Sequence, residues 1–200
     1  MTAPAVHDVL RIDPALARRW TEAPPWVQPA LAAAPWVVVR RAPPSSRIAV
    51  GVRGTERTER FAATIAGRDV RALRSPYDAA AGLPSRSRPL DRAARLTRAL
   101  AARCGLRCGF TGSYGFECAT GHVSTHAASD LDVVIARGAP RAALAAFALG
   151  CAAVTAETGV RIDAEVLLAA GGAALAEIVA SRGEVLVKTP AGPRLLQPAL

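Results

Sequence analysis

Residues 130–135, with the sequence Asp-Leu-Asp-Val-Val-Ile, restrict the possible fold of this chain more than any other segment. The Val- and Ile-rich end predicts a β-strand, because branched side chains favour extended backbone. Successive side chains of a strand point to opposite faces, so Asp130 and Asp132 share one face and the apolar residues share the other. Two carboxylates so close repel each other, and a divalent cation would relieve that repulsion. In isolation, the same pair would also suit a solvated strand end.

A second acidic segment follows at residues 161–166, with the sequence Arg-Ile-Asp-Ala-Glu-Val. Its acids also stand two residues apart, so Asp163 and Glu165 share one face of another predicted strand. If the two strands are neighbours in one sheet, three or four carboxylates converge. A two-metal phosphoryl-transfer site requires such a cluster, since its ions lie about 4 Å apart.

Small residues precede both strands, in the segment 108–115 with the sequence Cys-Gly-Phe-Thr-Gly-Ser-Tyr-Gly. It begins like a short apolar strand and ends in a turn at Gly112 and Ser113. Glycine permits the tight turn, and the backbone amides together with the Ser113 hydroxyl form a nest that suits phosphate oxygens. A Gly-Ser pair is common in ordinary turns, so this turn indicates function only in combination with the two acidic strands.

Prolines and small residues at positions 75–88 predict a boundary between two domains. We expect a small α+β N-terminal domain over residues 1–80. A second α+β domain, which carries the acidic strands on a mixed sheet flanked by helices, is expected over residues 88–200. Within the first domain, strands at 36–40 and 47–53 are expected to form a hairpin through a Pro-Pro-Ser-Ser turn.

Two segments of the second domain predict helices. Apolar residues at helical spacing after Pro89 predict a helix over residues 89–104. The longest uncharged apolar stretch, residues 142–154, predicts a buried helix, because its thirteen residues fall short of the roughly 20 needed to cross a bilayer. Residues 1–10 lack the basic start and apolar run of a secretion signal, so we expect a cytoplasmic protein without membrane attachment.

The positive charge of the chain is concentrated in one region. The formal net charge is +9, and residues 40–74 hold nine arginines against three acids. This region is either a solvated hairpin face or a surface that meets phosphates or an acidic protein, with Arg53 as a candidate contact. Reversing the charges of Arg53 and Arg57 would separate these interpretations, because a steering surface affects the rate at which the anionic partner reacts and the salt dependence of that rate.

A series of short motifs runs in order along the whole chain. They are His7-Asp8, Val38-Val39-Arg40-Arg41, residues 49–54, Gly112-Ser113, Thr120-Gly121, residues 129–132, residues 161–165 and residues 185–188. The Gly-Ser turn and the acidic strands resemble the DNA polymerase β type nucleotidyltransferase superfamily. The full series is similar to the phosphoribosyl-dephospho-CoA transferases of malonate decarboxylase, the holo-acyl-carrier-protein synthases. The connection between Ser113 and Asp130 is longer than in most of the superfamily, so the pattern does not predict the path of residues 114–128.

The resemblance implies a specific reaction. Enzymes of that family move the phosphoribosyl-dephospho-CoA group from its triphosphate precursor, 2'-(5-triphosphoribosyl)-3'-dephospho-CoA, to a serine hydroxyl of the acyl carrier subunit of malonate decarboxylase. A phosphodiester forms and pyrophosphate is released. The resemblance also implies Mg²⁺ or another divalent cation held by Asp130, Asp132 and Asp163. Asp163, or Glu165 in its place, would accept the serine proton.

Other residues would bind the phosphates. Gly112 and Ser113 would contact the β- and γ-phosphates, while Lys188, the single lysine of the chain, would place a compact charge on the triphosphate. A strand-edge lysine without such a task is an equal alternative. His7 and Asp8 match the family, but their chemistry indicates no role beyond capping the N-terminal segment.

The residues alone leave two other functions open. The same chemistry would serve transfer to another hydroxyl, on a small molecule, an RNA end or a protein side chain. A non-catalytic basic module that binds nucleic acid is the third interpretation, but aromatic residues make up only 4% of the chain, which argues against a base-stacking surface. Replacing Asp130 and Asp132 by asparagine separates these functions, since a binding module keeps its affinity whereas an enzyme loses turnover.

Overall fold

The computed structural model describes residues 3–56, 58–78 and 87–200. The chain divides into two compact units, Met1–Ser75 and Pro76–Leu200, and each has its own hydrophobic core. Both units combine helices with strands, so the expected α+β class is confirmed. Arg57 lies outside the described residues. So do residues 79–86, which are part of the Pro-rich segment 75–88 where a domain boundary is predicted.

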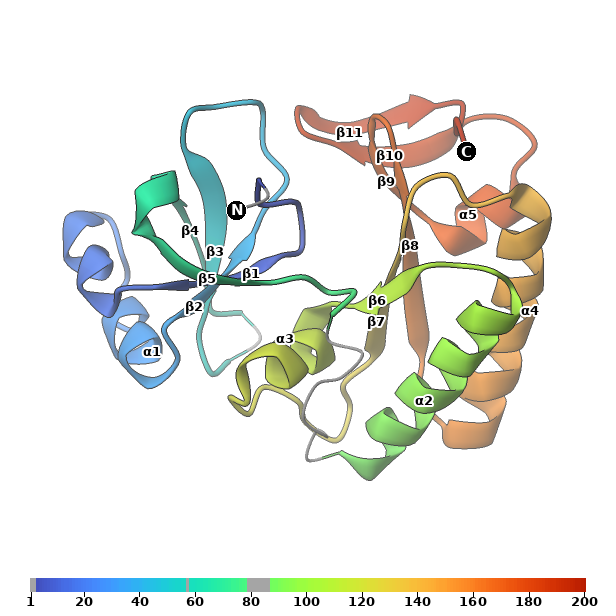
Figure 1. Ribbon diagram of the computed structural model, residues 1–200, viewed down its shortest axis with the longest axis horizontal. Coiled ribbons are helices and arrows are strands. Elements are labelled where there is room, and N and C mark those ends of the chain that lie inside the picture. The colour runs from blue at the N-terminus through green and yellow to red at the C-terminus, as the bar shows by residue number, and fades with distance from the viewer. Residues whose placement is uncertain (1–2, 57, 79–86) are drawn as a thin grey trace. The chain divides into compact units, whose positions relative to one another are not determined.

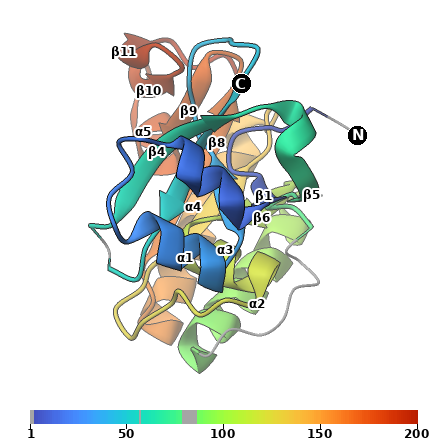
Figure 2. The same ribbon diagram turned by 90° about the vertical axis from the view of Figure 1, so that its left-hand side faces the viewer.

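The N-terminal unit is built on an antiparallel sheet of five strands in the order β4-β3-β2-β1-β5. Its strands are β1 (Val9–Ile12), β2 (Trp36–Val39), β3 (Ile48–Arg53), β4 (Arg60–Ile65) and β5 (Val70–Arg74). Its helical segments are η1 (Pro14–Arg19), α1 (Val27–Ala33) and η2 (Gly67–Asp69), of which η1 and η2 are 3₁₀ helices. Figure 2 shows η1 and α1 side by side on one face of this sheet.

The predicted hairpin is confirmed as the antiparallel pair of β2 and β3. Alternation determines which side of β3 meets the core, since Val50 and Val52 are buried in the same cluster as Leu31 of α1. Arg53 ends the strand and is only partly buried. The other face of β3 carries Ala49, Gly51 and Arg53, so Arg53 is the single charged side chain of this strand.

The C-terminal unit is built on a mixed sheet of six strands in the order β11-β10-β9-β8-β7-β6. Its strands are β6 (Cys108–Phe110), β7 (Leu131–Ile135), β8 (Ile162–Leu168), β9 (Gly171–Ala174), β10 (Val185–Thr189) and β11 (Gly192–Leu196). Its helices are α2 (Arg88–Arg103), α3 (Gly112–Thr120), α4 (Arg141–Thr158) and α5 (Leu175–Ala180). Figure 1 shows α2 and α4 side by side on one face of the sheet, so the expected mixed sheet flanked by helices is confirmed.

One pair of strands in this sheet is parallel. β7 and β8 run in the same direction, whereas every other neighbouring pair is antiparallel. Parallel neighbours need a crossover connection, and here α4 provides it between the end of β7 and the start of β8. This crossover brings the two acidic strands together.

Helix α2 matches the helix predicted over residues 89–104. The Ser87 hydroxyl caps its first turn by accepting a hydrogen bond from the Leu90 amide at 3.5 Å. Pro89 also lies in that turn, where its missing N–H is not needed. After the helix, Gly105 adopts a left-handed backbone conformation (φ 66°) that suits glycine.

The stretch 142–154 forms a helix as expected, but the expectation that this helix is buried is wrong. Four side chains of α4 are buried along one side, and Leu149 on the other side is 77% exposed. Alanine conceals this two-sided character in the sequence, because it is common both in cores and on helix surfaces. By length and composition alone α4 is apolar enough to cross a membrane, which by itself is weak evidence of a membrane span.

Candidate active site

The two acidic strands predicted from the sequence are neighbours. β7 and β8 pair with Asp132 directly beside Asp163. Neighbouring positions of paired strands present their side chains to the same face, so the two carboxylates share one face of the sheet. On the opposite face Leu131, Val133 and Ile135 are buried in the core. The sequence-based condition for converging acids is therefore met by this pair.

Gly112 places the start of α3 against Asp132. The backbone of Gly112 is left-handed (φ 60°), and a Cβ added there would lie 1.7 Å from Oδ2 of Asp132. The Thr111 amide, at the N-cap of α3, donates a hydrogen bond to the Asp132 carbonyl oxygen at 2.9 Å. Only glycine suits both the conformation and the close approach. The structure therefore brings the Gly112-Ser113 turn and the Asp-Leu-Asp strand together, with the N-terminal N–H groups of α3 beside them.

Arg161 lies among the acids. Asp130 immediately precedes β7, and Arg161 immediately precedes β8. The Arg161 guanidinium pairs with the Asp130 carboxylate and lies 3.5 Å from the Asp163 carboxylate, measured from Nη2 to Oδ2. The hydrogen bond and charge of Asp130, followed by the charge of Asp163, raise the pKa of Arg161. The Arg161 guanidinium thus occupies a place where the sequence predicts a divalent cation. Strand periodicity does not indicate that this arginine pairs with the acids.

Glu165 and Lys188 form a separate pair on the same face of the sheet. Lys188 is on β10 and Glu165 on β8, with β9 between the two strands. Their side chains approach to 3.6 Å between Nζ and Oε1. The Glu165 side chain is 15% exposed, against 54% for Asp163. Of the two acids on β8, Asp163 is therefore the more accessible.

A ready-made set of metal ligands is not present in the described part of the chain. Among residues 3–56, 58–78 and 87–200, no three His, Cys, Asp or Glu side chains are grouped so that they could hold an ion. The three predicted ligands, Asp130, Asp132 and Asp163, are all described and do not form such a group. The Arg161 guanidinium instead pairs with Asp130 and approaches Asp163. The oxygen donors nevertheless fit Mg²⁺, which one or two carboxylates usually hold while substrate phosphates and water complete its shell. Asp132 and Asp163 supply such a pair, and the position of Arg161 shows that this face accommodates positive charge.

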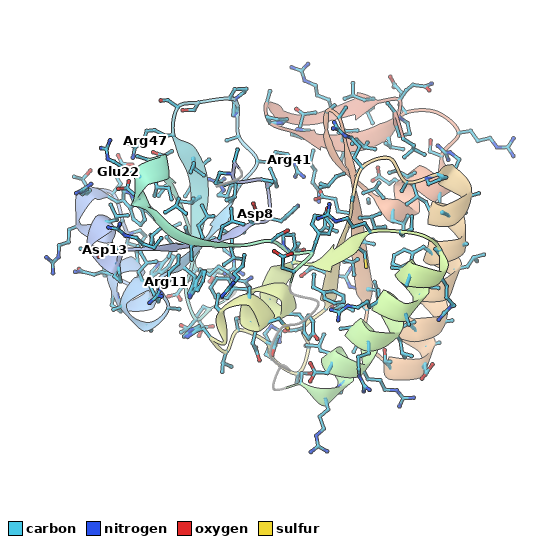
Figure 3. The ribbon with its side chains drawn as sticks, in the orientation of Figure 1. Asp8, Arg11, Asp13, Glu22, Arg41 and Arg47 are labelled. Atoms are coloured by element: carbon cyan, nitrogen blue, oxygen red, sulfur yellow. The ribbon has the colours of Figure 1, made fainter. Side chains whose placement is uncertain are left out.

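The Arg-rich region belongs to the N-terminal unit. Arg53 on β3 stands directly opposite Arg60 on β4. Arg47, just before β3, donates hydrogen bonds to a β4 threonine. Figure 3 shows Arg11, Arg41 and Arg47 in separate parts of this unit. These three arginines do not form one cluster, and the role of Arg53 as a substrate contact stays a prediction.

The sequence pattern predicted a turn at Gly112 and Ser113, but it did not indicate helix α3 or the role of Glu117 within it. α3 spans nine residues and ends at Gly121, whose backbone is left-handed (φ 73°). Glu117 is 5% exposed, although it carries a carboxylate. The available signal was a single acid within an otherwise small and apolar stretch followed by Thr120-Gly121, a common helix ending.

Comparison with known proteins gives matches along the whole chain. The family model described as the phosphoribosyl-dephospho-CoA transferase MdcG C-terminal domain matches residues 72–199. The model of the corresponding N-terminal domain matches residues 5–76. No solved structure matches the chain.

Curated relatives named phosphoribosyl-dephospho-CoA transferase are similar over nearly their full length. A relative from Pseudomonas putida is 36% identical over 201 residues, covering 98% of this chain and 95% of the relative. One from Pseudomonas aeruginosa is 37% identical over 197 residues, with coverages of 97% and 92%. One from Azotobacter vinelandii is 34% identical over 205 residues, with coverages of 96% and 92%. Because two domain models and full-length relatives agree with the motifs brought together at β7, β8 and α3, this chain belongs to the phosphoribosyl-dephospho-CoA transferase family.

Proposed function

We propose that this protein transfers phosphoribosyl-dephospho-CoA from 2'-(5-triphosphoribosyl)-3'-dephospho-CoA to a serine hydroxyl of the acyl carrier subunit of malonate decarboxylase. The products are a phosphodiester-linked carrier and pyrophosphate. Family membership supports the identity of the transferred group. The observation that supports the chemistry is the Asp132–Asp163 pair, with the Gly112 turn packed against Asp132.

The phosphates of the precursor are proposed to bind at Gly112 and Ser113. These residues begin α3, where the backbone N–H groups of a helix N-terminus and the helix dipole favour an anion. Close contact between Gly112 and the Asp132 carboxylate keeps this phosphate site beside the acid pair. Binding at this point would present the reactive phosphate to the carboxylate face of β7 and β8.

The proposed reaction depends on a divalent cation, for which Mg²⁺ is the first choice. Asp132 and Asp163 would hold it, joined by Asp130 when Arg161 moves away from that carboxylate. When bound, such an ion neutralises charge on the attacking and leaving oxygens of an in-line displacement. The released Arg161 guanidinium would then pair with the triphosphate, which offers it oxygens in a similar geometry.

Asp163 is proposed to accept the serine proton. The serine Oγ forms a bond to the α-phosphorus while the bond from that phosphorus to the bridging oxygen breaks. Pyrophosphate leaves with the electron pair, and the hydroxyl proton passes to the Asp163 carboxylate. Glu165 is the reserve candidate, because it is less exposed than Asp163 and is paired with Lys188.

Positive groups away from the acid pair are proposed to guide the substrate and the carrier. Lys188 is exposed on β10, and its flexible stem would let it exchange Glu165 for a substrate phosphate. Arg53 and the other arginines of residues 40–74 give the N-terminal unit a positive surface. Acyl carrier proteins are typically acidic, so this surface would attract the proposed partner.

Intact-mass measurement of the carrier subunit tests the proposal. We expect the carrier, incubated with this protein, Mg²⁺ and the triphosphate precursor, to gain the mass of the prosthetic group and to release one pyrophosphate per transfer. A carrier whose acceptor serine is replaced by alanine is the matched control and should gain nothing. Transfer to a small molecule, RNA or another protein in place of the carrier would show that the acceptor is different. Nucleic-acid binding without transfer, unchanged by Asp130→Asn and Asp132→Asn, would indicate a binding module.

A further inference from the structure

The buried carboxylate of Glu117 lies outside the acid pair and has no part in the scheme above. It is in the middle of α3 (Gly112–Thr120) and is 5% exposed. Its Oε2 accepts hydrogen bonds from the Ser124 amide at 3.0 Å, from the Thr125 amide at 2.8 Å and from the Thr125 hydroxyl at 2.7 Å. A single carboxylate oxygen therefore holds two consecutive residues of the loop that follows α3.

That loop, residues 121–129, connects the phosphate turn to Asp130. It contains no helix or strand of its own, so its position depends on contacts with its surroundings. The Ser124 hydroxyl donates a hydrogen bond to the Ser113 carbonyl oxygen at 2.9 Å, one helical turn from Glu117. The loop is therefore attached to α3 at the proposed phosphate-binding residues as well as at Glu117.

The second half of the loop is a closed turn that ends at Asp130. The His126 amide donates to the Ser129 hydroxyl at 2.9 Å, and the Ser129 amide donates to the His126 carbonyl oxygen at 3.0 Å. Asp130 is the next residue in the chain, and the Leu131 amide after it donates to the Arg161 carbonyl oxygen at 2.9 Å. Movement of residues 124 and 125 would therefore be passed through a short, hydrogen-bonded turn to Asp130.

A buried carboxylate destabilises a fold unless hydrogen bonds compensate for the water it loses. Hydrogen bonds to an ionised acceptor are about twice as strong as neutral ones, so Glu117 is a strong anchor for the Ser124 and Thr125 amides. An apolar residue at this position of α3 would pack in the core without that cost but would leave the loop unattached. The hydrogen bonds to Ser124 and Thr125 therefore explain why a buried carboxylate is placed at position 117.

We propose that Glu117 is a positioning residue, which fixes the loop 121–129 so that Asp130 and the Gly112-Ser113 turn keep one relative placement. This inference rests on the proposed function, because Asp130 and the turn matter together only if both meet the triphosphate substrate. Glu117 itself touches neither the substrate nor the reacting atoms in this scheme. It acts through Ser124 and Thr125.

The matched variants Thr125→Val and Thr125→Ser test the proposal without altering Glu117. Valine keeps the shape of threonine and removes one hydrogen bond to the carboxylate, whereas serine keeps that bond. For Thr125→Val we expect kcat for transfer to fall about tenfold, with little change in KM for the triphosphate precursor and in the melting temperature. Thr125→Ser should remain within about twofold of wild type. Glu117→Gln, which retains an acceptor oxygen but loses the charge, should show an equal or larger loss of kcat.

Hydrogen exchange provides a readout that does not depend on activity. In Thr125→Val and Glu117→Gln, the amides of residues 121–129 should exchange about tenfold faster than in wild type, while those of β7 and α2 keep their rates. Unchanged loop exchange in both variants would overturn the anchoring role, and faster exchange with unchanged kcat would overturn the positioning role. If wild type transfers nothing, the proposed function fails and the positioning role fails with it, whereas the exchange rates still show whether Glu117 anchors the loop.

Discussion

Each unit of this protein places like charges opposite each other on neighbouring strands, but the two pairs have different surroundings. In the N-terminal unit Arg53 stands opposite Arg60 on the antiparallel strands β3 and β4. In the C-terminal unit Asp132 stands beside Asp163 on the parallel strands β7 and β8. Like charges in directly opposed positions destabilise a sheet by up to about 1 kcal/mol. Neither pair is therefore explained by sheet stability.

The difference lies in what other segments bring to each pair. Beside the acids lie the left-handed Gly112, which tolerates no Cβ there, and the Arg161 guanidinium. Beside the arginines, the Arg60 guanidinium donates a hydrogen bond to the carbonyl oxygen of its neighbour Glu59 at 3.0 Å. A like-charge pair becomes a candidate active site when segments distant in the sequence converge on it. The acid pair meets that condition, and for the arginine pair a steering surface stays a prediction.

The largest effect is expected from removing the acids. Asp132→Asn and Asp163→Asn should each lower kcat for carrier modification on the order of a thousandfold, because each removes charge that would hold the cation. Both side chains are at least partly exposed, so the melting temperature should change little. Steady-state kinetics with the carrier as acceptor gives the measurement. Arg60→Gln relieves the other like-charge pair and serves as the control; an equal loss in that variant would remove the distinction between the two pairs.

Gly112→Ala should have the second-largest effect. A Cβ at this position would collide with the Asp132 carboxylate, so the turn or the acid must shift, and a displacement of about 1 Å can cost a hundredfold in rate. Gly105→Ala is a matched control, because Gly105 has a similar left-handed backbone (φ 66°) with no atom within 4 Å of the added Cβ. Both variants should lose about 1 kcal/mol of stability from backbone strain, measured by denaturant unfolding. Only Gly112→Ala should lose activity, and equal activity in both variants would contradict the close-packed site.

Arg161→Ala should have a smaller effect, and it should be a gain: the variant should bind a divalent cation more tightly than wild type. The guanidinium competes with a cation for Asp130 and Asp163, so its removal should tighten Mn²⁺ binding about two- to fivefold at low salt. Calorimetric titration of the protein with Mn²⁺ measures this change. Arg161→Lys should lie between alanine and wild type. Weaker binding in Arg161→Ala would show that the arginine supports the cation site and does not compete with it.

The smallest effect is expected from the arginine pair. Reversing both charges, in the double variant Arg53→Glu with Arg60→Glu, should lower kcat/KM for the carrier about two- to threefold at low salt. The difference should disappear at about 0.5 M salt, because the attraction is screened there. Transfer rates measured across a salt series provide the test. An unchanged rate and salt dependence would mean that this surface does not steer the carrier.

Local patterns in the sequence were sufficient for several elements of the fold. Period-two alternation indicated β7, with its acids on one side and its apolar residues on the other, and helical spacing with Pro89 indicated α2. The β2–β3 hairpin followed from two apolar runs separated by a turn. These elements depend on neighbours within a few residues, which is the range that sequence periodicity reports.

Long-range arrangement and side-chain direction could not be read from such patterns. The pairing of Asp132 with Asp163 depends on the crossover through α4. From the sequence alone, the two carboxylates were expected to converge only if their strands were neighbours in one sheet. The position of Arg161 depends on a side-chain conformation, and the burial of Glu117 depends on where the loop 121–129 returns. The sequence pattern did not indicate the exposed side of α4, because alanine is common both in cores and on helix surfaces.

Binding of Mn²⁺ to wild type, Asp132→Asn and Asp163→Asn is the most direct test of a cation site between β7 and β8. The loss of the free-ion signal in electron paramagnetic resonance would follow binding, in the presence of pyrophosphate to complete the coordination shell. We expect wild type to bind the ion and each variant to bind it at least about tenfold more weakly, because each strand contributes one carboxylate. Equal binding by wild type and Asp163→Asn, or no binding by wild type, would contradict the account.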